Sequence, residues 1–230
     1  MDLSSVTGGR ASGIVKVDKF KSGALCLAFL AGLAFAGVAR GESASGSPRL
    51  HDASFVSVGQ RTLVPHGWID FCSRQPAECA QGARRPVDIR LTAATLRDLE
   101  RVNSFANRKI EPVSNFEHWG TMVDHWDYPT DGKGDCKVYA LYKRKLLMQK
   151  GYPRQALLMT IVRDLNGEGH AILTVKTDRG DFVLDNLSAD VRPWSATGYQ
   201  FYKRQAQDDP NVWLSLGGVT GTEEAIGDRQ

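Results

Sequence analysis

The sequence predicts one α+β domain in which two long helices precede an antiparallel meander of strands. Three observations support this class. Apolar residues recur at helical spacing from Thr92 to about Ile110, and a second helical segment runs from Cys136 to Lys150. Short apolar runs separated by turn residues follow from Ala156 onward. The chain has 230 residues, which is enough for one domain of ordinary size with its own hydrophobic core.

Residues 1–39 have the pattern of a signal peptide. Three lysines, the last of them Lys21, precede an uncharged apolar run from Gly23 to Ala39 that ends in small residues. We expect export to the periplasm, with cleavage near Ala39. The alternative is an uncleaved membrane anchor, because a run of about 17 residues is at the short limit for spanning a bilayer. This segment is the only membrane attachment that we expect.

Composition divides the rest of the chain into three parts. Residues 40–60 are rich in Ser, Gly and Ala and lack a periodic apolar pattern, so we expect a flexible lead-in. The folded domain is expected to span residues 61–217. Residues 218–230 are expected to form a loose tail.

The charge balance argues against a nucleic-acid partner. The whole chain has 29 basic and 26 acidic residues, of which four and two lie within residues 1–39. The exported part therefore has 25 basic and 24 acidic residues. Binding to a phosphate backbone requires a clustered excess of Lys and Arg. The exported chain has no such excess.

The cysteines predict one disulfide and one remaining thiol. Export would place the chain in an oxidising compartment, where neighbouring cysteines pair. Cys72 and Cys79 bracket a short loop that contains a proline, so a local disulfide between them is expected. Cys136 is then left without a partner. It is either buried and inert or retained for chemistry.

The two predicted helices have recognisable ends. Thr92 is a favourable N-cap for the first helix. The second helix begins at Cys136 and ends before Gly151. Between the helices, prolines and glycines make the segment up to Gly134 irregular. Its tryptophans, Trp126 among them, either wall a substrate cleft or fill the core.

The second half of the chain is predicted to be a sheet. Two successive hairpins join strands at Ala156–Arg163, His170–Thr177 and Asp181–Asn186. Further strands are expected at Tyr199–Arg204 and Val212–Leu216.

A cysteine, a histidine and an aspartate occupy positions suited to nucleophilic catalysis. A thiol attacks only as the thiolate, and the free N–H groups and dipole at a helix N-terminus stabilise a thiolate. Cys136 has that placement. His170 at the start of one strand is the candidate base, and Asp185 at the end of the next strand is the candidate group that orients it.

Strand alternation supports the pairing of His170 and Asp185 but leaves them apart. With the hairpin turn centred on Arg179 and Gly180, both side chains project from the same face. That register also separates them by roughly 13 Å along the strands. An off-centre turn or a bulge must therefore bring them together. The same alternation points Asn186 the other way.

Three alternatives to the catalytic interpretation remain. In the first, Cys136 is an inert thiol in the core. In the second, His170 is a hydrogen-bonded residue at a strand end without a catalytic role. The third alternative is a metal site formed by His118, His125 and Asp124. The spacing of these three residues lacks the helical or knuckle pattern of recognisable metal sites.

Four short motifs carry a resemblance to a known family. They are Gly134-Asp135-Cys136, Tyr139-Ala140, Gly169-His170-Ala171 and Leu184-Asp185-Asn186. Together they resemble the bacterial transglutaminase-like cysteine proteinases, a family that includes periplasmic proteases which release large surface adhesins. The resemblance extends from about Gly67 to Leu216. It implies a papain-like or transglutaminase-like core, with the Cys-bearing helix packed on an antiparallel sheet that carries His and Asp.

The chain departs from that family beside the nucleophile. Adhesin-cleaving members resemble Asp-Cys-Glu-Asp there, and their flanking carboxylates help to bind calcium. This chain keeps Asp135 but has Lys137 and Val138 in the next two places. A cation and an apolar group do not replace oxygen donors for a hard ion. We therefore expect no cofactor, with Asp135 as a calcium ligand only if such a site survives.

The expected function is that of an exported cysteine protease acting on a protein or peptide in the cell envelope. Cys136 would attack the carbonyl, His170 would transfer the proton and Asp185 would hold the imidazole tautomer. Trp126 is the candidate second oxyanion donor beside the Cys136 backbone N–H. A protein-crosslinking transglutaminase is one alternative. The other is a non-catalytic periplasmic binding protein on the same fold.

Overall fold

The computed structural model describes residues 53–80 and 82–217. The expected signal peptide of residues 1–39 and the expected tail of residues 218–230 lie outside these ranges. Within the described ranges, no helix has the length and apolar character needed to cross a membrane.

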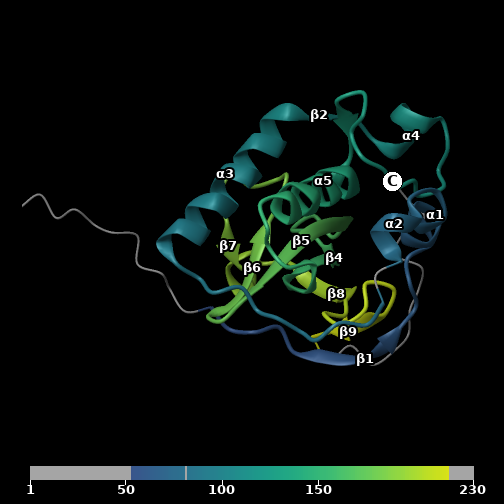
Figure 1. Cartoon of the computed structure of the whole chain (residues 1–230). Coiled ribbons are helices and arrows are strands. Elements are labelled where there is room, and N and C mark those ends of the chain that lie inside the picture. Colours follow the sequence, from purple (N-terminus) through teal and green to yellow (C-terminus); the bar gives the residue numbers. More distant parts are fainter. Residues whose placement is uncertain (1–52, 81, 218–230) are drawn as a thin grey trace, which may run out of the picture. The chain divides into compact units, whose positions relative to one another are not determined.

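The described domain combines helices with a large antiparallel sheet, which confirms the predicted α+β class (Figure 1). The helices are α1 (His66–Arg74), α2 (Pro76–Cys79), α3 (Ala93–Lys109), α4 (Asn115–Trp119) and α5 (Cys136–Gln149), with short 3-10 turns η1 (Arg154–Ala156) and η2 (Trp194–Ala196). The strands are β1 (Val58–Thr62), β2 (Glu111–Pro112), β3 (Lys133–Gly134), β4 (Leu157–Arg163), β5 (Gly169–Thr177), β6 (Gly180–Leu184), β7 (Arg192–Pro193), β8 (Gln200–Gln205) and β9 (Trp213–Leu216).

The sheet has the strand order β1-β9-β8-β4-β5-β6-β7, and every neighbouring pair is antiparallel. Helix α5 packs on β5 and β4, and α3 packs beside α5 (Figure 1). A separate parallel pair, β2 and β3, lies directly before α5 in the chain. The Cys-bearing helix therefore lies on the sheet, as the family resemblance implied.

Local signals set the ends of the two long helices. The Thr92 side chain accepts a hydrogen bond from the Thr95 N–H and caps α3. Asp135 caps α5 by accepting from the Lys137 N–H at 3.3 Å. Helix α5 stops at Gln149, and Gly151 follows with φ +91°, a conformation that glycine adopts without strain.

The central hairpin has a different register from the one expected. Thr177 pairs with Gly180 and Leu173 with Leu184, so the turn is centred between Asp178 and Arg179. If this pairing continues for one more residue beyond Leu184, Asp185 lies opposite Ile172. Ile172 is two residues from His170 on the same strand, so Asp185 and His170 are neighbours on the same face of the sheet. The gap inferred from the sequence was therefore too long.

The N-terminal strand was not predicted. Strand β1 falls partly within residues 40–60, which we expected to be a flexible lead-in, so that boundary was set too late. It pairs with β9 through Val58–Leu216 and Thr62–Trp213. Its side chains are mostly exposed, so the segment has no apolar alternation to reveal it, and its backbone pairing depends on residues more than a hundred positions away.

Three buried tryptophans fill the space between α1 and the end of the sheet. Trp126 lies edge-on to Trp68 at 6.1 Å and to Trp213 at 6.2 Å between ring centroids. Gly67 allows the close approach, because a Cβ there would lie 2.1 Å from a Trp126 ring atom.

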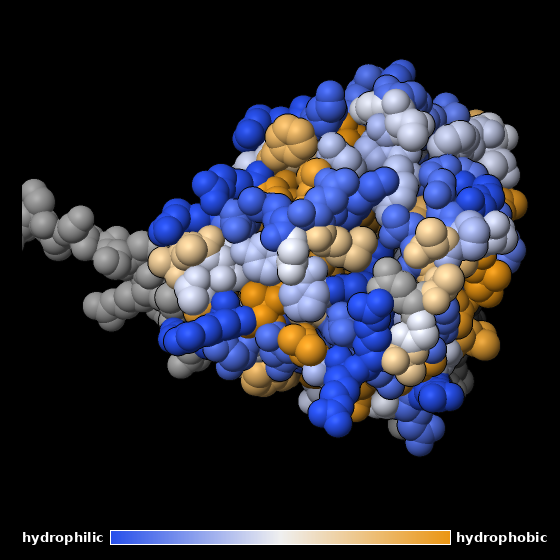
Figure 2. All heavy atoms as spheres, viewed as in Figure 1, coloured by the Kyte–Doolittle hydropathy of each residue, from blue (hydrophilic) through white to orange (hydrophobic). Residues whose placement is uncertain are grey.

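On the face of the domain in Figure 2, hydrophilic residues predominate and apolar ones lie in small groups.

The predicted disulfide between Cys72 and Cys79 is present and joins α1 to α2. Among the described residues, Cys136 is the free cysteine.

Candidate active site

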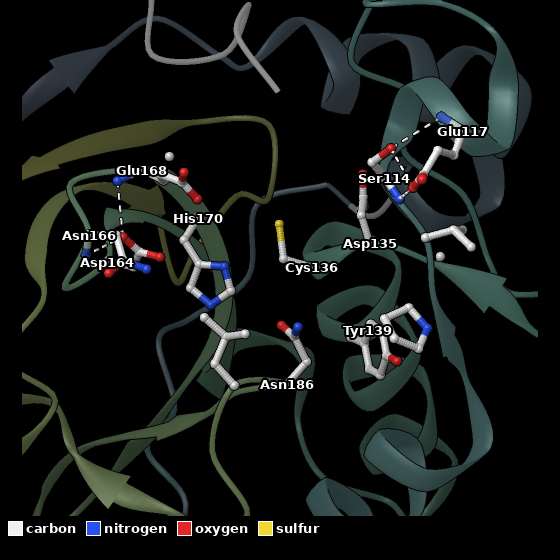
Figure 3. Close-up of a pocket in the computed structure, with 15 residues that line it drawn as sticks. Ser114, Glu117, Asp135, Cys136, Tyr139, Asp164, Asn166, Glu168, His170 and Asn186 are labelled. Atoms are coloured by element: carbon white, nitrogen blue, oxygen red, sulfur yellow. Dashed lines mark hydrogen bonds between the residues drawn. The ribbon is translucent and has the colours of Figure 1, made fainter.

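Cys136 occupies the first position of α5, directly after its capping residue Asp135. The N–H groups of a first helical turn have no partner within the helix, and they favour negative charge at this end. The thiol lies beside the His170 imidazole, which comes from the start of β5 (Figure 3). The structure thus brings the predicted nucleophile next to the predicted base.

His170 forms a hydrogen bond from Nε2 to Asp185 Oδ1 at 2.8 Å. Both residues are buried, with relative exposures of 6% and 2%. Because Nε2 is used by Asp185, Nδ1 is left for Cys136. Burial lowers the pKa of His170, but hydrogen bonds with Asp185 and Cys136 outweigh burial and raise it to about 10. The imidazolium form is therefore favoured in this environment.

Asp185 is held by several donors that fix its carboxylate. The Tyr199 hydroxyl donates to Oδ2 at 2.7 Å, and the Leu187 N–H donates to Oδ1 at 3.0 Å. The Asn103 side chain accepts from the Asp185 N–H at 3.1 Å. Burial alone would raise the pKa of Asp185, but the hydrogen bond with His170 and these donors lower it below its usual range. Asp185 is therefore an anion that can orient the imidazole.

Tyr199 was missed as a site residue by sequence reasoning. We expected it only as the first residue of a strand. No local sequence pattern identifies Tyr199 as a hydrogen-bond donor to a carboxylate. Its contact with Asp185 depends on how the chain between the two residues folds.

Cys136 and His170 line a cleft of about 370 Å³ (Figure 3). Among the described residues, its lining includes Cys136, Tyr139, His170, Asn186, and the carboxylates Glu117, Asp135, Asp164 and Glu168. The position of Asn186 differs from the prediction. Alternation along the strand was expected to point Asn186 away from His170, but both residues line the cleft. Strand β6 ends at Leu184, and the chain turns at Asn186, so alternation no longer applies there.

Trp126 does not lie where the predicted oxyanion donor was expected. Its side chain has no exposed surface, and its indole N–H donates to Asp124 Oδ2 at 2.7 Å. The ring fills the core beside Trp68 and does not line the cleft. The indole N–H is therefore already used by Asp124 and is not free to meet an oxyanion.

The alternative metal site does not assemble. His118 Nε2 lies 2.8 Å from Asp131, and the Trp119 ring contacts both His118 and His125, at 4.1 and 4.4 Å between centroids. Asp124 instead accepts from Trp126 and Lys137. In the part of the chain that the structure describes, no three His, Cys, Asp or Glu side chains are grouped as metal ligands.

Lys143 is an unusual buried cation on α5. Its side chain has no exposed surface, and within the described ranges its Nζ lacks a hydrogen-bond partner. Burial lowers the pKa of Lys143 to about 7, although the charge of Asp185 opposes the shift.

Lys143→Met is expected to stabilise the domain by on the order of 3 kcal/mol near pH 6, because methionine removes a buried charge from an apolar site. The folded pKa is lowered, so the wild-type penalty is complete below about pH 7 and is relieved as the pH rises toward the unfolded value of about 10.5. Denaturant unfolding of both proteins between pH 6 and 10 measures this difference. An advantage that does not shrink with rising pH would contradict the prediction.

A helix that begins with a cysteine and packs on an antiparallel sheet with a buried histidine places this chain among the papain-like and transglutaminase-like proteins. The family model described as "Bacterial transglutaminase-like cysteine proteinase BTLCP" matches residues 58–220. The chain therefore belongs to this family and is a cysteine peptidase of the transglutaminase-like type.

Three solved structures from Legionella pneumophila are similar to the chain. Calcium-bound LapG is 25% identical over 57% of this chain and 76% of its own, with a TM-score of 0.44. A second structure of LapG is 28% identical over 51% and 66% of the two chains, with a TM-score of 0.43. EGTA-treated LapG is 27% identical over 53% and 70%, also with a TM-score of 0.43. No curated protein matches the chain.

Proposed function

We propose that the chain is an exported protease that hydrolyses a peptide bond with Cys136 as nucleophile, His170 as proton carrier and Asp185 as orienting group. The observation that carries the proposal is the buried hydrogen bond between His170 and Asp185, with Cys136 on the other side of the imidazole. This order of groups is the one that nucleophilic acyl transfer requires.

The reaction follows from the positions of these groups. The Cys136 thiolate attacks the carbonyl carbon, and the resulting oxyanion is met by N–H groups of the first turn of α5. His170 then protonates the leaving amine, and the acyl-enzyme forms. Water attacks the acyl-enzyme with His170 as base, which releases the acid and regenerates the thiolate. Asp185 keeps Nε2 as the donor throughout.

The surroundings of the cleft support a protein as substrate. The cleft is open to solvent beside α4, and Phe116 and Trp119 of this helix are exposed. Exposed apolar groups next to a cleft suit an extended chain with side chains on both sides of the scissile bond. We also propose that residues 1–39 are a signal peptide cleaved near Ala39, and that the substrate lies in the cell envelope.

Alkylation by iodoacetamide tests the proposed nucleophile without a known substrate. Cys136 is expected to react at neutral pH on the order of tenfold faster than glutathione, because a free thiol is only a few per cent thiolate there. His170→Ala is expected to remove this advantage, whereas Lys150→Met, which breaks an exposed ion pair with Asp98, is expected to keep it. Peptide mass mapping identifies the labelled residue. Slow labelling of Cys136 in the wild type would overturn the proposal.

A further inference from the structure

Lys137, directly after the nucleophile, lies between two carboxylates. Its Nζ is 2.5 Å from Asp124 Oδ1 and 2.6 Å from Asp135 Oδ2. The three side chains are mostly buried, with relative exposures of 12%, 21% and 17%. Asp124 belongs to the loop before α5, and Asp135 is the cap of α5. One ammonium group therefore links this loop to the first turn of the catalytic helix.

The remaining oxygens of both carboxylates are also used within the chain. Asp124 Oδ2 accepts from the Trp126 indole at 2.7 Å, and Asp135 Oδ1 accepts from the Lys137 backbone N–H at 3.3 Å. The contacts run without interruption from the core tryptophan to the start of the catalytic helix. Such a charge-assisted network restrains both ends more strongly than neutral hydrogen bonds would.

These residues do not fit a calcium ion. Calcium requires six to eight oxygen ligands at about 2.3–2.6 Å. The space between Asp124 and Asp135 is taken by a positively charged amine, which repels a second cation. Val138 contributes no oxygen from its side chain and is 2% exposed, packed against Gly134. The donor set that remains cannot coordinate the ion.

We propose that Lys137 is a built-in cation that takes the place of a divalent metal, holding the loop of Asp124 against α5 and stabilising the Cys136 thiolate. The inference rests on the proposed function, since it assigns Lys137 a positioning role at the same site. Burial lowers the pKa of Lys137, but the negative charges of Cys136, Asp135 and Asp124 outweigh burial and raise it. Lys137 therefore remains charged at neutral pH.

The experiment measures two properties of the full exported chain that need no peptide substrate. The first is the rate of Cys136 alkylation by iodoacetamide as a function of pH. The second is the thermal unfolding midpoint with calcium chloride and with EGTA. In the wild type, neither property is expected to change with calcium or EGTA.

Lys137→Met is expected to shift the alkylation profile to higher pH and to slow labelling at neutral pH by about tenfold, because an opposite charge near a titrating group is worth one or more pH units. Lys137→Arg keeps the charge and is expected to keep the profile. Lys150→Met loses one exposed lysine and is the matched control, with no expected change. An unchanged profile in Lys137→Met would overturn the inference.

Lys137→Glu reverses the charge and leaves three carboxylates together. Its unfolding midpoint is expected to rise with calcium chloride and to return with EGTA, unlike that of the wild type. If Lys137→Met does not fold, the wild type and Lys137→Arg still decide the matter: a wild-type midpoint or labelling rate that depends on calcium would overturn the inference. A chain that labels rapidly but cleaves no peptide would instead overturn the proposed function.

Discussion

Cys136→Ala is expected to reduce peptidase turnover by at least about 10⁴-fold, because no other group takes the place of the attacking sulfur in acyl-enzyme formation. The cysteine is half-buried at the start of α5, and alanine is a good helix former, so the fold should be retained. The assay uses the internally quenched peptide that the wild type cleaves fastest in a combinatorial library.

Two controls separate loss of chemistry from loss of structure. The circular dichroism spectrum and unfolding midpoint of Cys136→Ala should match those of the wild type. Lys150→Met, altered directly after the last residue of α5, should retain full turnover. Undiminished cleavage by Cys136→Ala would show that the reaction uses a different nucleophile.

Asp185→Asn is expected to lower kcat by about 10²–10⁴-fold with a much smaller change in KM. The asparagine amide can donate where the carboxylate accepted, so it stabilises the wrong tautomer of His170. The change nearly preserves shape, and the backbone bonds of residue 185 to Asn103 and Asn107 remain. The measurement is steady-state cleavage of the same quenched peptide.

The pH profile provides a second readout for Asp185→Asn. The hydrogen bond with Asp185 helps to raise the pKa of His170 to about 10, so its loss should lower that pKa. The alkaline limb of kcat, where the imidazolium loses its proton, is expected to move to lower pH. Tyr199→Phe removes only the bond to the other carboxylate oxygen and should cost much less in kcat. Equal losses in the two variants would contradict the role assigned to Asp185.

The sequence alone predicted the elements whose signals are local. Thr92 and Gly151 mark helix ends because capping depends on a few adjacent residues. The disulfide between Cys72 and Cys79 follows from their short separation of 7 residues in the sequence. The α+β class and the family are confirmed by the fold and the family match. The placement of Cys136 at a helix start was likewise readable from its neighbours.

Only the tertiary structure decided the contacts between distant segments. The register of β5 and β6, the pairing of β1 with β9, and the bond from Tyr199 to Asp185 each depend on where whole strands lie. Trp126 lies in the core, where it packs against Trp68 and Trp213, and not at the wall of the cleft. The sequence placed Lys137 beside the nucleophile, but only the fold put Asp124 within reach of its ammonium. Local propensity cannot encode such distances, because each is set jointly by segments far apart in the chain.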